Sequence, residues 1–170
     1  YKLTTYAASG IPSGLIFWNK LEDTDLVSEI GGNGRQSGAA FEAGRFGNCV
    51  RIDAVGEAVS FNFSDINIDP NRFTIEWWMN TDYNVTNGVA PAVQLLHYIA
   101  DDSGMVQYLY ISPASDQAIR INRRSNGYID IDNTSDWNSG TWKHFALVTD
   151  RSASFDGGKT VALYIDGVQT

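Results

Sequence analysis

The chain has 170 residues, of which 43% are hydrophobic, and its 12 basic and 20 acidic residues give a net charge of -8. This length and apolar content suit one folded domain and argue against disorder. The negative charge repels a nucleic-acid backbone, and no apolar run is long enough to cross a bilayer as a helix. Nucleic-acid binding and a membrane span are therefore not expected.

Short alternating segments separated by Gly, Asn and Asp predict a succession of strands and turns. In chain order, the sequence predicts an apolar strand over 14–18, a glycine-rich loop over 31–38, and a hairpin around Gly56 formed by 49–54 and 58–63. The next strand, 73–79, alternates so strictly that one face should pack inward. Further strands are predicted over 93–99, 106–112, 118–123, 128–132, 142–149 and 160–166.

This pattern predicts an all-β chain in which hairpin follows hairpin, the arrangement of an antiparallel sandwich. No internal repeat or linker interrupts it, so residues 1–170 are predicted to be one domain. The lone cysteine, Cys49, has no partner for an internal disulfide and is expected to be a structural thiol.

Four motifs together carry a resemblance to a known family: GRFG (44–47), FTIEWWM (73–79), GTWKHFALVTD (140–150) and VALYIDGVQ (161–169). They resemble the laminin G-like, concanavalin A-like lectin/glucanase jelly roll, over a core of 14–169. The resemblance implies two antiparallel sheets packed face to face. It does not imply one activity, because this fold carries lectins, glycosidases, adhesion modules and spacers.

The chain departs from the family's pattern at its end. Members typically add further strands after the one that matches 160–166, and the last runs beside the strand that matches 14–18. Here the sequence stops at Thr170. Because natural sheets avoid unpaired edges, we expect either a longer polypeptide, from which this chain is excised, or strands supplied by a partner subunit.

Sugar binding requires aromatic surfaces for the apolar side of a sugar ring, with amides, carboxylates or Arg around them. Six residues opposite the expected core offer these groups: Trp78, Tyr108, Tyr110, Arg120, Asn122 and Asp130. They are the predicted ligand-binding residues. For Trp78 the resemblance also implies the alternative that it packs structurally. For the two tyrosines the alternative is that they complete a half-buried sheet.

The sequence lacks the catalytic pattern of glucanases on this fold, which resemble one another in carrying two Glu residues a few positions apart on one strand. The closest two glutamates of this chain, Glu22 and Glu29, are seven positions apart. Asp130 and Asp132 share a strand face, but such a pair on a short Asn-rich strand more often caps a turn. His97 and His144 lack an accompanying nucleophile motif. We therefore expect no catalytic residues.

Oxygen-rich loops suit calcium, which takes six to eight oxygen ligands. The predicted ligands of a structural Ca²⁺ are Asp23, Asp25, Asn33 and Asp53. The alternative is that these side chains cap turns.

These observations favour a non-catalytic recognition or adhesion module that binds glycans or other surface proteins, in an extracellular position or on a cell or virion surface. Two alternatives stay open. One is a building block of a filament, sheath or phage appendage that contacts further domains or subunits. The other is a glycoside hydrolase or lyase with atypical carboxylates.

Overall fold

The computed structural model describes residues 15, 18–19, 21–22, 24–54, 56–66, 68–69, 72–80, 94–100, 106–111, 119–123, 127–131, 139–150, 152 and 161–169. Within these ranges the structure consists of antiparallel strands, and its one helix is the four-residue α1, Phe63–Ile66. The predicted all-β antiparallel class is confirmed.

The chain forms two compact units. One comprises Tyr1–Met79 and His144–Gly167, and the other comprises Asn80–Lys143 and Val168–Thr170. The prediction that 1–170 is a single domain stays a prediction.

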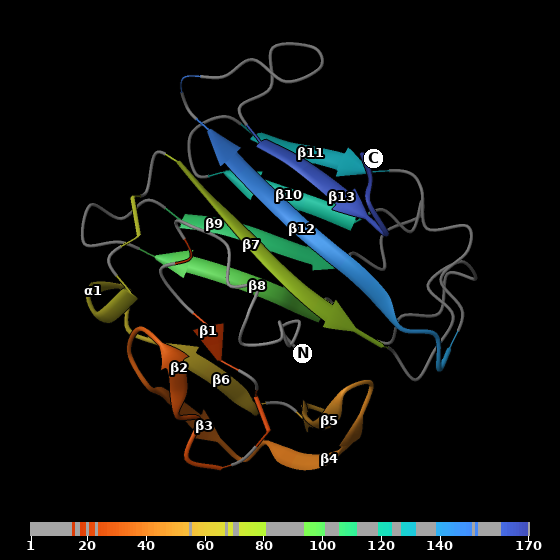
Figure 1. Ribbon diagram of the computed structural model, residues 1–170. Helices are drawn as coiled ribbons and strands as arrows, with labels where there is room; N and C mark the ends of the chain where they lie inside the picture. The colour runs from red at the N-terminus through yellow and green to blue at the C-terminus, as the bar shows by residue number, and fades with distance from the viewer. Residues whose placement is uncertain are drawn as a thin grey trace. The chain divides into compact units, whose positions relative to one another are not determined.

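One sheet has four strands in the order β14–β13–β12–β7 (Figure 1). Its strands are β7 (Arg72–Met79), β12 (Lys143–Asp150), β13 (Val161–Ile165) and β14 (Val168–Gln169). In β7 the predicted alternation is confirmed, because Trp77 and Met79 are buried whereas Thr74 is exposed.

The apolar positions of this sheet form a closely packed core. Phe145, Leu147 and Leu163 have no solvent-exposed area. Leu147 and Leu163 are directly opposite each other in β12 and β13, and the ring of Trp77 stacks on that of Phe145 with 5.3 Å between centroids. Burial of these side chains is the main source of the sheet's stability.

The family resemblance implies a hairpin in the VALYIDGVQ motif, and the turn between β13 and β14 confirms it. Asp166 and Gly167 have φ values of 51° and 81°, the left-handed pair that a two-residue type I′ turn requires. Asp166 also fixes the start of β12, since its backbone N–H donates to the His144 carbonyl (2.8 Å) and its Oδ1 accepts from the His144 N–H (2.9 Å).

An ion pair joins the start of β7 to the end of β12. Arg72 Nε donates to Asp150 Oδ2 at 2.9 Å. The Ser152 hydroxyl and backbone N–H both donate to Asp150 Oδ1, at 2.7 and 2.9 Å. The Ser152 hydroxyl bond, together with the Ser152 N–H and Arg72, lowers the pKa of Asp150 below its ordinary value.

Three two-stranded sheets lie in the N-terminal part of the chain. They are β1 (Trp18–Asn19) with β2 (Ser28–Ile30), β3 (Gly34–Ser37) with β6 (Ala58–Phe61), and β4 (Ala40–Gly44) with β5 (Gly47–Arg51). A separate buried cluster of Leu21, Leu26, Ala39 and Val50 lies among these elements, with Phe41, Val59 and Phe61 packed against it.

The predicted loop over 31–38 is wrong for Gly34–Ser37, which form β3 and pair with β6. Three of the four β3 residues are exposed, so the strand has no apolar alternation by which to recognise it. Gly34 is needed for packing, because a Cβ there would lie 2.5 Å from Cε1 of Phe61.

The predicted hairpin of 49–54 with 58–63 is also wrong, since β5 pairs with β4 and β6 pairs with β3. The turn Arg45–Phe46, followed by Gly47 with a φ of 105°, joins β4 to β5 instead. The strand predicted over 14–18 is observed only at its last residue, Trp18, where β1 begins; among the described residues Leu15 is not in a strand.

The second four-stranded sheet has the order β11–β10–β9–β8 (Figure 1). Its strands are β8 (Gln94–Ala100), β9 (Val106–Ile111), β10 (Ile119–Arg123) and β11 (Gly127–Ile131). All four agree with the predicted strands to within a residue at either end. The sequence also predicts a loop over 84–91 and a turn at Gly157–Gly158, and both lie outside the described residues.

Replacement of Leu163 by Ala should lower the free energy of unfolding by about 2–5 kcal/mol, because it leaves a cavity in the core. Urea denaturation measures this change. The control is Val168→Ala, at a position that is 64% exposed, which should change stability by less than about 0.5 kcal/mol. Equal effects of the two substitutions would contradict the assignment of the core.

Replacement of Asp150 by Asn should remove an acid-sensitive part of the stability. A carboxylate whose pKa is lowered by folding stabilises the folded state above its unfolded pKa of about 3.9, and this contribution disappears as the pH falls through the lower folded pKa. The difference in urea midpoint between wild type and Asp150→Asn should therefore be constant at neutral pH and shrink below about pH 4. Ser152→Ala should reproduce part of the change, whereas a difference that does not depend on pH would contradict this account.

Candidate functional site

The register of the β8–β11 sheet brings polar and aromatic positions into rows across the strands. Tyr108 of β9 is opposite both Tyr98 of β8 and Asn122 of β10, and Asn122 is opposite Tyr128 of β11. One row therefore crosses all four strands. With neighbouring strands about 4.8 Å apart, it extends over roughly 14 Å.

A second row lies two residues along the strands and on the same face. Tyr110 is opposite Arg120, and Arg120 is opposite Asp130. This row also reaches β8 at Leu95. The two rows bring aromatic, amide, guanidinium and carboxylate residues to one face, because alternate residues of a strand share a face.

The alternate positions of these strands carry most of the apolar residues. Leu109, Ile121 and Ile129 form one row, which His97 joins in β8. Ile111, Ile119 and Ile131 form another, which Gln94 joins in β8. A third row on this face is polar at Gln107 and Arg123 and ends at Gly127 in β11. A sheet with this division has one face suited to a core and one suited to solvent or a ligand.

Five of the six predicted ligand-binding residues belong to these two rows: Tyr108, Tyr110, Arg120, Asn122 and Asp130. The sixth, Trp78, lies in β7 of the other four-stranded sheet. Sequence reasoning missed Tyr98 and Tyr128. Tyr128 is two residues before Asp130 in the same strand, so the alternation of the strand would have identified it. Tyr98 is placed opposite Tyr108 by a register shift between Leu95 and His97, and no sequence pattern predicts that shift.

Trp78 is instead surrounded by groups of its own unit. The Arg45 guanidinium carbon lies 3.7 Å from the centroid of the Trp78 ring, and the Phe46 ring contacts Trp78 edge-on with centroids 5.8 Å apart. The His144 ring lies 5.0 Å away. These contacts leave Trp78 half-buried and suit a structural role as well as a binding one.

Two buried nitrogen atoms in this cluster are unsatisfied. Trp78 Nε1 and His144 Nε2 have no hydrogen-bond partner among the described residues. Glu76 Oε2 lies 3.7 Å from His144 Nε2, beyond hydrogen-bond distance.

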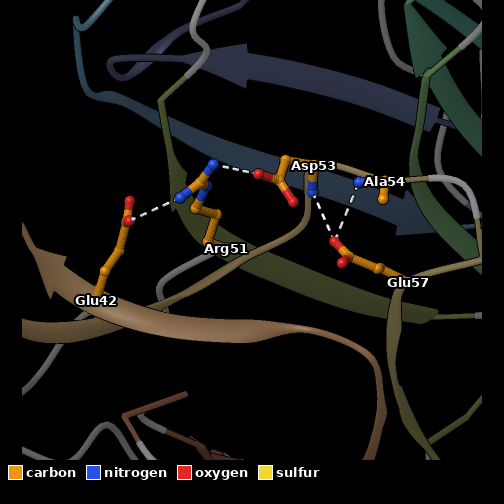
Figure 2. A network of polar contacts seen from close by, with 5 residues as sticks. All are labelled: Glu42, Arg51, Asp53, Ala54 and Glu57. Atoms are coloured by element: carbon orange, nitrogen blue, oxygen red, sulfur yellow. Dashed lines mark hydrogen bonds and ion pairs between the residues drawn. The ribbon is translucent and has the colours of Figure 1, made fainter.

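The predicted calcium ligand Asp53 is engaged by a protein cation. Figure 2 shows Arg51 between Asp53, with which it forms an ion pair, and Glu42, whose Oε2 lies 3.6 Å from Arg51 Nη1. On the other side of Asp53, Glu57 Oε2 accepts the backbone N–H groups of Asp53 and Ala54 at 2.8 and 3.1 Å. This network closes the turn between β5 and β6.

Of the remaining predicted calcium ligands, the structure describes Asn33 and Asp25. Asn33 Oδ1 accepts the backbone N–H of Ser28 at 3.0 Å, Asp25 is exposed, and Asp23 lies outside the described residues. In the part of the chain that the structure describes, no three His, Cys, Asp or Glu side chains are placed to hold a metal ion.

The loop that carries Asp25 is organised around a buried asparagine. Asn19 is fully buried; its Nδ2 donates to the Leu26 carbonyl at 2.7 Å, and its Oδ1 accepts the Leu21 N–H at 2.7 Å. Leu21 and Leu26 have φ values of 56° and 46°. Left-handed conformations of this kind cost about 1–3 kcal/mol each and persist because the surroundings hold them.

The structure describes only some of the residues considered for catalysis. Asp130 is in β11, whereas Asp132 lies outside the described residues. Cys49 is buried, and the Cβ of any residue that replaced Gly44 would lie 2.6 Å from the Cβ of Cys49. The thiol is thus part of the β4–β5 packing, as expected of a structural cysteine.

Comparison with known proteins identifies the family. The family model described as "Concanavalin A-like lectin/glucanases superfamily" matches residues 55–170, more than half of the chain. The chain therefore belongs to this superfamily, and the resemblance drawn from its four motifs is confirmed. No curated protein and no solved structure matches it.

Membership of this family supports a carbohydrate- or protein-binding module at the family level. Laminin G-like domains are commonly extracellular. Among the described residues, no helix is long and apolar enough to cross a membrane.

Proposed function

We propose that this chain is a non-catalytic recognition module of an extracellular or surface protein, and that it binds carbohydrate through the polar face of the β8–β11 sheet. The observation that carries the proposal is the register that aligns Tyr98, Tyr108, Asn122 and Tyr128 in one row. A flat array of aromatic and amide residues supplies both stacking surfaces and hydrogen-bonding groups for a sugar.

The charges favour a neutral glycan as the ligand. The second row pairs one cationic position, Arg120, with one anionic position, Asp130, so the face has no excess of either sign. The whole chain has a net charge of -8 and repels polyanionic glycans at low salt. A neutral polysaccharide that lies across the strands needs no excess of charge on this face and is not repelled by the negative charge of the chain.

The absence of catalysis is part of the proposal. It is supported by the spacing of the five glutamates, none closer than seven positions to another, because a retaining glycosidase needs two carboxyl groups about 5 Å apart. Incubation with polysaccharides should accordingly release no reducing ends or unsaturated products.

Tyr108→Ala should weaken binding to a neutral polysaccharide by about tenfold, since loss of an aromatic anchor at a binding site typically costs more than 1 kcal/mol. Arg120→Ala should weaken it by about fivefold. A glycan array selects the ligand, and isothermal titration measures each Kd, with calcium and with a chelator so that a contribution from the predicted ion is seen. Near-UV circular dichroism checks that each variant is folded.

The matched control is Arg35→Ala, which removes an exposed arginine from β3 and should leave Kd unchanged. Equal affinity of wild type and both variants would exclude the β8–β11 face as the site. If no glycan of the array binds and the protein self-assembles in solution, the alternative of a filament, sheath or appendage subunit is favoured. Release of sugar products would favour the glycoside hydrolase or lyase alternative.

A further inference from the structure

The β4–β5 turn and strand β7 form a corner of two aromatic rings that holds a cation. The rings of Phe46 and Trp78 are inclined at 74° with centroids 5.8 Å apart. The guanidinium carbon of Arg45 lies 3.7 Å from the Trp78 centroid and 5.3 Å from the Phe46 centroid. All three residues belong to one compact unit.

This arrangement has the chemistry of an aromatic cage. The negative faces of aromatic rings attract cations within about 6 Å, most strongly for Trp, and two rings at a steep angle surround a compact cation on two sides. Glu76 lies two residues before Trp78 on the same strand and therefore on the same sheet face. Its carboxylate adds negative charge to the region, although it also lies 3.7 Å from His144 Nε2.

Among the described residues, the Arg45 side chain contacts the rings of Phe46 and Trp78, and no carboxylate forms an ion pair with it. Arg45 is exposed, and Phe46 is 41% exposed. A cation–π contact at an exposed site contributes only about 0.5–1 kcal/mol, so another cation can displace this guanidinium.

The strands that carry Arg45 are also separate from the larger sheet. Among the described strands, β4 and β5 pair only with each other, and the Arg45–Phe46 turn joins them. The net charge of -8 raises the local concentration of cationic ligands around the protein.

We infer that the Phe46–Trp78 corner is a binding site for a compact cationic group, an ammonium or guanidinium carried by a ligand, and that Arg45 is the internal occupant that such a group displaces. This site is separate from the proposed glycan face and does not depend on it. The competing explanation is that Arg45 only joins the hairpin to the sheet, in which case removal of Arg45 leaves no site.

Tetramethylammonium is the probe, because it has the charge and shape of a compact cation and forms no hydrogen bonds. The readout is the NMR resonance of the Trp78 indole N–H, which the spectrum of Trp78→Phe identifies among the five tryptophans. The whole 170-residue chain is used, at constant ionic strength. In Arg45→Ala the resonance should shift saturably, with an apparent affinity about two to five times that of wild type, where the guanidinium competes.

Two controls separate cation binding from unspecific effects. Neutral tert-butanol, which has a similar shape, should not shift the resonance, and Arg45→Ala combined with Phe46→Ala should respond more weakly than Arg45→Ala. Arg45→Gln repeats the test with a longer neutral side chain, in case Arg45→Ala does not fold. The inference is overturned if neither Arg45 variant responds, if tert-butanol acts as strongly as tetramethylammonium, or if wild type binds as well as the variants.

Discussion

The structure depends on the register of antiparallel pairing. In β8–β11 the register collects Leu109, Ile121 and Ile129 on one face and Tyr108, Asn122 and Tyr128 on the other. A slip of one residue between two strands would exchange these faces and place polar groups where the apolar ones belong. The same alternation buries Trp77, Phe145 and Leu163 in the sheet that contains β7. The alternation of apolar and polar residues therefore favours one register, and the register determines which polar residues become neighbours.

Much of this could be predicted from the sequence, because long alternating strands carry their own signal. The strand over 73–79 and the four strands of the second sheet were predicted with nearly correct ends. The in-register group of Tyr108, Tyr110, Arg120, Asn122 and Asp130 followed from strand parity alone. The family followed from the same segments.

The remainder depends on contacts between residues distant in sequence. Strand β3 is mostly exposed, and its sequence resembles that of a loop. It is recognised as a strand from its pairing with β6. The predicted hairpin around Gly56 is wrong because β5 pairs with β4 across the Arg45–Phe46 turn, and not with β6. Asp53 resembles a calcium ligand in the sequence, yet Arg51 lies beside it in space (Figure 2). Trp78 is of a residue type that often binds sugars, so the sequence suggested a binding role. Its contacts with Arg45 and His144 could not be foreseen, because these residues come from distant segments.

The central claim is that one face of the β8–β11 sheet is the recognition surface. It is tested most directly by titrating the isotope-labelled protein with a neutral polysaccharide fragment and following every backbone amide by NMR. The account predicts that the largest shifts fall at Tyr98, Tyr108, Tyr110, Arg120, Asn122, Tyr128 and Asp130, while the amides of β4 and β5 stay unchanged. Shifts concentrated in β3–β6, or spread evenly through the chain, would contradict it.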